Sequence, residues 1–237
     1  GAGHRRRSKR EPRESRRTEP PVQVGVGVSM QTRPTPLKDP RLSVIQGGLT
    51  PAEPSPFPAT GEGIRAHAAV SLILRGGPEL DILLIRRAKA EGDPWSGHIA
   101  LPGGRREGGD RDLLHTAMRE TMEETGVHLQ ARGVPLGRLG TVEPSTARLP
   151  LIAIHPFVFG VPEDTGAHAA SREVDGVLWT PLSHFLDRST HGTVEIPLGD
   201  VTRTFPCFHL EKGVIWGLTY RIFTNFLEAM EASEVQT

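Results

Sequence analysis

The sequence predicts an α/β fold in which helices cover both faces of a mixed β-sheet. Two observations lead to this prediction. Apolar runs of strand length recur through the chain, and they alternate with stretches whose apolar residues repeat every three or four positions. Such alternation is typical of a layered α/β/α sandwich. At 237 residues, the chain is long enough for one such domain with a substantial core.

The first half of the predicted sheet comes from three apolar runs. AHAAVSLILR at 66–75 and LDILLIRR at 80–87 have the length of strands, and a shorter run follows at 97–101. Similar runs recur in the second half of the chain. The full set of expected strands is 66–75, 80–87, 97–101, 134–142, 150–161 and 174–180, and helices are expected at 111–125, 181–187 and 216–231.

The helix expected at 111–125 is framed by residues that suit its two ends. Asp110 or Asp112 can cap its start, and Gly126 can take the left-handed conformation that ends it. Its apolar positions repeat as a stripe that faces a core requires. The residues expected in that core are Leu114, Ala117, Met118, Thr121 and Met122.

Three glutamates share the other face of this helix. At 100° per residue, Glu120, Glu123 and Glu124 fall within about a quarter of the circumference. Two carboxylates about 4 Å apart repel each other by roughly 4 kcal/mol at an effective dielectric near 20. The cluster therefore indicates a bound cation, and its hard oxygen ligands suit Mg²⁺ or Mn²⁺. A solvated helix face is the alternative explanation.

A glycine pair precedes the helix. Gly103 and Gly104 have no side chains, so the backbone there can approach a metal ion and a phosphate closely, and a carbonyl group can serve as a ligand. An ordinary turn between a strand and a helix would also explain the pair. Arg119 lies one turn before Glu123, where its guanidinium can pair with the carboxylate and hold it in one rotamer.

The glycine pair and the helix together resemble the Nudix box, whose pattern is a Gly, a spacer, and then R-E-x-x-E-E-x-G-hydrophobic. The second half of the pattern matches fully in RETMEETGV at 119–127. The first half departs from it, because the box expects a Glu eight residues before the Arg. Arg111 occupies that position here, with Asp110 beside it. A spacer one residue longer, with Asp110 in the role of that Glu, resembles the coenzyme A diphosphatase branch of the family.

Other segments resemble the same branch. The run LLIRRAKAEGDPWSGHIALPGG at 83–104 is similar to its L-L-x-x-R-S…G-x-V-x-F-P-G-G element. Two details differ, since Ala88 replaces the expected Ser and Asp93 stands where an Arg is usual. The segments that follow the branch in order are 155–158, 173–182 and 215–219.

The resemblance implies a Nudix α/β/α sandwich with a mixed sheet and a metal-dependent hydrolase of nucleoside diphosphate derivatives. It implies that Mg²⁺ or Mn²⁺ is held by the three glutamates and the carbonyl group of Gly104. It also implies that Gly103 contacts the substrate. Arg119 would orient the cluster. The general base is either Glu120 or Glu173, because Nudix enzymes take it from the box or from a later loop.

For the substrate, the branch implies coenzyme A or acyl-coenzyme A. Arg86 and Arg87 could receive the 3′-phosphate, although a basic strand end explains them as well. Because Asp93 is negative where the branch is positive, ADP-ribose, NADH and dinucleoside polyphosphates stay as alternatives. A sensor module that binds a nucleotide without turnover is an alternative of another class, although this chain keeps all three box glutamates.

Charge and composition divide the chain into three parts. Residues 1–20 contain eight Lys or Arg and three Asp or Glu, and are expected to be a disordered basic lead. Residues 21–62 are rich in Pro and Gly and are expected to be an extended arm or linker with little regular structure. Residues 63–237 form the expected hydrolase domain. Nucleic-acid binding by the lead is disfavoured, because no aromatic residues are interspersed for base stacking.

The remaining expectations concern the cell and the assembly. A single cysteine, Cys207, excludes an internal disulfide and favours a reducing, cytoplasmic location. No apolar stretch approaches the 18 residues of a membrane span. A homodimer is considered beside a monomer, because Nudix domains are often dimers.

Overall fold

The computed structural model describes residues 1, 39–53, 66–89, 97–144 and 152–234. The basic lead at 1–20 and most of the expected arm at 21–62 therefore lie outside the described residues, apart from Gly1 and 39–53. Within the arm, residues 40–47 form helix α1 (Pro40–Gly47), where little regular structure was expected. Asp39 caps its start, Pro40 takes the first turn, and α1 contacts helix α5 and strand β5.

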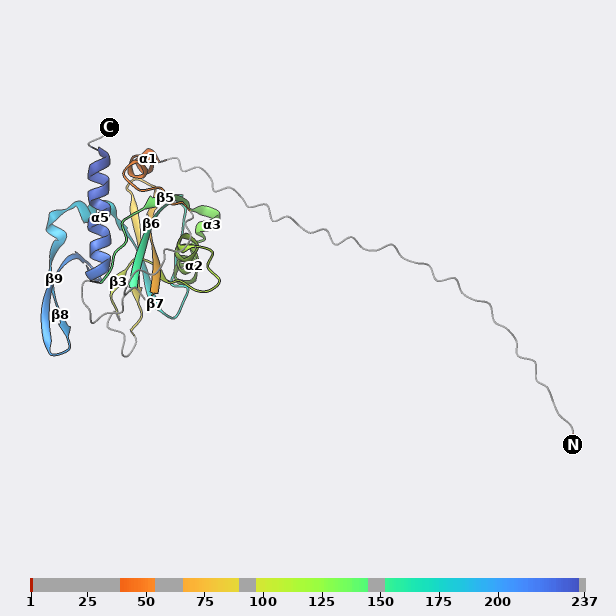
Figure 1. Cartoon of the computed structure of the whole chain (residues 1–237). Helices are drawn as coiled ribbons and strands as arrows, with labels where there is room; N and C mark the ends of the chain where they lie inside the picture. Colours follow the sequence, from red (N-terminus) through yellow and green to blue (C-terminus); the bar gives the residue numbers. More distant parts are fainter. Residues whose placement is uncertain (2–38, 54–65, 90–96, 145–151, 235–237) are drawn as a thin grey trace. The chain divides into compact units, whose positions relative to one another are not determined.

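A seven-stranded mixed sheet forms the centre of the molecule (Figure 1). The order β3-β2-β1-β6-β5 runs across it, β4 pairs with β1, and β7 pairs with β2. β1 and β6 are parallel, and the other described pairs are antiparallel. The strands are β1 (Ala66–Arg75), β2 (Asp81–Arg87), β3 (Ile99–Ala100), β4 (Gly103–Arg105), β5 (Val134–Arg138), β6 (Ile152–Val161) and β7 (Val174–Pro181).

Helices lie on both faces of this sheet. Figure 1 shows α2 (Leu113–Thr125) and α3 (Leu129–Arg132) on one side, and α1 and α5 (Gly217–Glu234) on the other. The two cores follow from the alternation of side chains along β1. Leu72 and Leu74 join the core beneath α1 and α5, whereas Ala69 and Ile73 join the core beneath α2. The predicted α/β sandwich with a mixed sheet is confirmed.

A second, three-stranded sheet was not expected from the sequence. Helix α4 (Leu182–Leu186) and a short 3-10 turn (Arg188–Thr190) lead into β8 (His191–Leu198), β9 (Val201–Leu210) and β10 (Gly213–Trp216). The sequence of β8 does carry a strand signal that the predicted set of strands omits, because Val194, Ile196 and Leu198 are partly buried and alternate with exposed residues. Phe208 and Ile215 join the main core from this sheet.

The helix that carries the glutamates has the predicted ends and one wrong core position. Asp112, not Asp110, caps its start by accepting a hydrogen bond from the His115 amide at 2.7 Å, and Gly126 ends it at φ 70°. Met122 is 43% exposed, so its expected place in the core is wrong. Buried hydroxyls tie α2 to β1, since Thr121 Oγ1 donates to Ser71 Oγ at 2.8 Å. No helix among the described residues is long and apolar enough to cross a membrane.

Candidate active site

The glycine pair lies in β4, between β1 and the carboxylates of α2. The amide of Gly103 donates a hydrogen bond to Glu124 Oε2 at 2.8 Å. Gly103 has φ 151°, and a Cβ atom there would lie 2.3 Å from the carbonyl oxygen of Ala69. At Gly104, a Cβ atom would lie 2.5 Å from the carboxylate of Glu120. Only glycines therefore allow the backbone to pass between β1 and both carboxylates.

The two glycines are expected to respond differently to substitution. Gly103→Ala places its methyl group against backbone and in a strained φ region, and should lower the free energy of unfolding by roughly 1–3 kcal/mol. Gly104→Ala meets the movable carboxylate of Glu120 instead, so it should spare stability and reduce activity. Urea unfolding measures the stability of each variant, and initial rates measure its activity. Equal effects on stability would contradict it.

Glu124 is a buried carboxylate, with 5% of its surface exposed. Burial raises the pKa of Glu124 to about 7, the amide of Gly103 opposes this, and the negative charge of Glu120 adds to it. Arg87 lowers the pKa of Glu124 and Glu173 raises it, so both groups act on this carboxylate. The helical period alone placed Glu124 on the same face as Glu123 but gave no sign of its burial, which depends on the position of β4.

Arg119 organises the remaining carboxylates. Its Nε and Nη2 atoms donate to the two oxygens of Asp110 at 2.9 and 3.0 Å. Its Nη1 atom lies 3.0 Å from both Glu120 Oε1 and Glu123 Oε2, so the predicted pairing one turn along the helix is present. Its Nη2 atom also donates to the carbonyl oxygen of Arg105 at 3.1 Å. Arg119 thus fixes two box glutamates relative to the loop before the helix.

Asp110 accepts two hydrogen bonds from the guanidinium of Arg119 and is itself almost fully buried. Its side chain is 1% exposed and accepts further hydrogen bonds from the Glu107 amide and from Thr116 Oγ1, both at 2.9 Å. Burial alone would raise the pKa of Asp110, but the hydrogen bonds from Arg119, Glu107 and Thr116 outweigh it and hold that pKa below its usual range. Asp110 remains ionised, and its charge balances that of the half-buried guanidinium of Arg119.

The other predicted site residues lie where β2 meets β7. The amide of Ala88 donates to the carbonyl oxygen of Glu173 at 2.7 Å, which places Glu173 beside the end of β2. Arg86 and Arg87 are successive residues at the end of β2, where the pairing with β7 shifts its register. Arg86 forms an ion pair with Asp175. The positive charge of Arg87 instead lowers the pKa of Glu124. Asp93 lies outside the described residues.

Comparison with known proteins places this geometry in a family. Residues 65–197 match the NUDIX domain family. The chain belongs to the Nudix family. It is 32% identical over 173 residues to the uncharacterized Nudix hydrolase NudL of Yersinia enterocolitica, covering 73% of this chain and 86% of that protein. It is also 33% identical over 141 residues to an uncharacterized protein, C14C4.10c, of Schizosaccharomyces pombe, covering 56% of this chain.

The match covers different shares of the relatives. The chain spans 43% of the length of the Schizosaccharomyces pombe protein. Among solved structures, a MutT/nudix family protein from Enterococcus faecalis aligns with a TM-score of 0.50 at 19% identity, covering 70% of this chain and 62% of that one. This likeness supports the Nudix fold. The family match makes the domain a Nudix hydrolase, as the sequence predicted.

The Nudix box residues have the chemistry of a divalent-metal site. Glu120, Glu123 and Glu124 present hard carboxylate oxygens beside the Gly103–Gly104 backbone, where no side chain intervenes. Among the described residues, no three acidic, histidine or cysteine side chains converge as preformed metal ligands. Arg119 engages two of the carboxylates and the Gly103 amide engages the third, which offsets their mutual repulsion. This donor set has the chemistry that a hard divalent cation requires.

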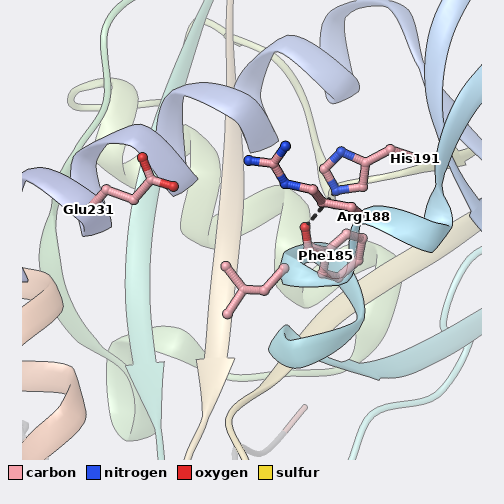
Figure 2. A pocket seen from close by; sticks show the side chains of 5 residues that line it. Phe185, Arg188, His191 and Glu231 are labelled. Carbon is pink, nitrogen blue, oxygen red and sulfur yellow. Dashed lines mark hydrogen bonds between the residues drawn. The ribbon is translucent and has the colours of Figure 1, made fainter.

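A hollow of about 410 Å³ lies apart from the Nudix box residues (Figure 2). It is lined by Phe185, Leu186, Arg188, His191 and Glu231, which come from α4, the 3-10 turn, β8 and α5. His191 Nε2 donates to the carbonyl oxygen of Phe185 at 3.0 Å, so that imidazole is part of the local fold. None of these residues was a predicted site residue, and the hollow does not coincide with the carboxylate cluster.

Proposed function

We propose that this Nudix hydrolase cleaves the diphosphate linkage of a nucleoside diphosphate derivative with the help of Mg²⁺ or Mn²⁺, and that coenzyme A or acyl-coenzyme A is its preferred substrate. The observation that carries the proposal is the contact of Glu124 with the amide of Gly103. It brings the last box carboxylate against side-chain-free backbone, where a metal and a diphosphate can approach together.

Glu120, Glu123, Glu124 and the carbonyl group of Gly104 would hold the cation. When bound, the cation neutralises phosphate charge and lowers the pKa of an attacking water. Arg119 acts as a positioning residue, since its guanidinium already holds Glu120 and Glu123 at 3.0 Å. The backbone at Gly103 and Gly104, which carries no side chain, would leave room for the phosphates beside the cation.

Two residues compete for the role of general base. Glu120 lies within the cluster, and burial raises its pKa, although Arg119 opposes this. Glu173 immediately precedes β7, beside the end of β2, and its negative charge raises the pKa of Glu124. A base must lie within reach of the attacking water and titrate near the working pH. Comparing the pH–rate profiles of Glu120→Gln and Glu173→Gln separates them, because loss of the base removes the acidic limb of the profile.

Support for coenzyme A comes from sequence segments that resemble the coenzyme A diphosphatase branch. Residues 83–104 and the segments after the box occur in the same order as in that branch. Hydrolysis would yield a 3′-phosphoadenosine phosphate and a phosphopantetheine. Because Ala88 and Asp93 depart from the branch pattern, ADP-ribose, NADH and dinucleoside polyphosphates are the competing substrates. All share the nucleoside diphosphate group that the site would bind.

Recognition of the 3′-phosphate is expected to depend on Arg87 more than on Arg86. Arg87 acts on the buried carboxylate Glu124, whereas Asp175 already neutralises Arg86. Arg87→Ala should raise KM for coenzyme A roughly tenfold more than KM for dephospho-coenzyme A, as expected for a lost charge-assisted phosphate contact. Arg86→Ala is the matched control and should change both values alike. A reversed order would assign the phosphate to Arg86.

A panel of substrates tests the function as a whole. The full chain is incubated with Mg²⁺ or Mn²⁺ and coenzyme A, acetyl-coenzyme A, ADP-ribose, NADH or diadenosine polyphosphates, with products identified by mass. Glu123→Gln and Glu124→Gln serve as controls. Cleavage of coenzyme A that both variants lose supports the proposal. Cleavage of ADP-ribose alone overturns the substrate, and inactivity toward every compound favours a binding module without turnover.

A further inference from the structure

Three aromatic side chains form a cluster where the two sheets meet. His98 precedes β3, Phe205 lies in β9, and Trp216 ends β10. The rings of His98 and Trp216 meet edge to face with centroids 5.2 Å apart, and those of Phe205 and Trp216 are also 5.2 Å apart. All three residues are half-buried. We call these residues the ring cluster.

The ring cluster is connected to the carboxylate site through the backbone of β2. The amide of Arg87 donates to the carbonyl oxygen of His98 at 3.0 Å, and Arg87 is the residue that acts on Glu124. From His98 to Gly103, five residue steps span at most about 18 Å. Because His98 lies across from Arg87 where β2 pairs with β3, the ring cluster lies at the same end of β2 as Arg87.

Two glycines set the backbone beside these rings. Gly97, next to His98, has φ 75°, and Gly217, next to Trp216, has φ 66°. Both values lie in the left-handed region that glycine adopts readily. Gly217 turns the chain from β10 directly into α5, which leaves Trp216 at the end of the strand rather than inside the helix.

We propose that His98 and Trp216, backed by Phe205, form the platform on which the purine base of the substrate stacks. This inference rests on the proposed function and names the recognised part of its substrate. Flat aromatic rings accept any base by its π-face, so such a platform selects nucleotides over diphosphates without a base. Phe205 and Trp216 lie outside residues 65–197, which match the NUDIX domain family.

The platform predicts that a base is bound independently of turnover. The measurement is equilibrium binding of AMP and of ribose 5-phosphate to the full chain with Mg²⁺, by calorimetry. Wild type is expected to bind AMP at least tenfold more tightly than ribose 5-phosphate. Trp216→Leu should abolish this preference, while Trp216→Phe, which keeps a ring, should retain most of it.

Several results decide the matter. Equal binding of AMP and ribose 5-phosphate by wild type overturns the platform, as does a folded Trp216→Leu variant that still prefers AMP. If Trp216→Leu does not fold, His98→Gln takes its place, and an unchanged preference in that variant overturns the role of His98. Because binding needs no chemistry, a wild type that prefers AMP but cleaves nothing contradicts the proposed hydrolase activity and leaves the platform supported.

Discussion

Glu124→Gln is expected to stabilise the metal-free protein at pH 8 while removing its activity. The pKa of Glu124 is raised from 4.5 to about 7, so ionising it in the folded protein costs about 3 kcal/mol that glutamine does not. The amide oxygen of glutamine can still accept the hydrogen bond from Gly103. Activity should fall by roughly 10²–10³-fold or more, because a charge that acts on the reacting phosphates is lost. Urea unfolding with chelator and initial rates with Mg²⁺ measure the two effects.

The pH dependence gives this expectation its sign. Between about pH 4.5 and 7, the folded protein keeps the proton on Glu124 and the unfolded chain has lost it. The contribution of Glu124 to the free energy of unfolding therefore falls as pH rises through this window. Glu124→Gln should remove that slope. Glu123→Gln is the matched control, because it makes the same chemical change at a side chain that is 55% exposed and leaves Glu124 in place, so it should keep the slope of the wild type. A wild type with the same slope as Glu124→Gln would contradict a buried, protonated Glu124.

Metal binding should be coupled to the same proton. A carboxylate must be ionised to act as a ligand, so binding releases the proton that Glu124 carries below pH 7. The affinity for Mg²⁺ should therefore weaken as pH falls from 7 toward 5. The burial of an ionised Glu124 destabilises the metal-free protein. A bound cation would offset the free energy that this ionisation costs.

The helix and its glutamates could be predicted because their signals are local. The 3.6-residue period, the Gly126 stop and the spacing from Arg119 to Glu123 all lie within one stretch, and the structure shows each of them. The main strands were predictable for a related reason. β1 is buried on both faces over most of its length, so its sequence is apolar apart from His67, Ser71 and Arg75.

Features that depend on distant contacts could not be predicted in this way. The burial of Glu124 follows from the position of β4, 21 residues away along the chain. Strand β9 is exposed over its first four residues and depends on pairing with β8, so its sequence gave little signal, whereas the alternation of Val194, Ile196 and Leu198 in β8 was a local signal that could have been used. Helix α1 was missed because its stability depends on packing Leu42 and Ile45 against the core rather than on a regular stripe.

Asp110→Asn is expected to have the largest effect on stability among substitutions near the site. Asp110 is 4% exposed and makes two hydrogen bonds to Arg119. Asparagine has nearly the same shape but no charge, so the guanidinium of Arg119 would lose its buried counter-charge. Removing one partner of a buried pair costs roughly 3–5 kcal/mol. Because Arg119 would no longer be held against Glu120 and Glu123, activity should also fall by roughly 10–100-fold.

Asp112→Asn is the matched control for this experiment, since it makes the same chemical change two residues along the chain. Asp112 caps α2 through the amide of His115, and asparagine caps helices about as well as aspartate, so its stability should hardly change. The pKa of Asp110 is lowered, so its stabilisation is present at neutral pH and is lost as pH falls below about 4. Asp110→Asn should lack this acid-induced loss. A destabilisation below about 1 kcal/mol with normal rates would show that Arg119 is positioned by the rest of the loop, and that the buried aspartate is not the equivalent of the box glutamate.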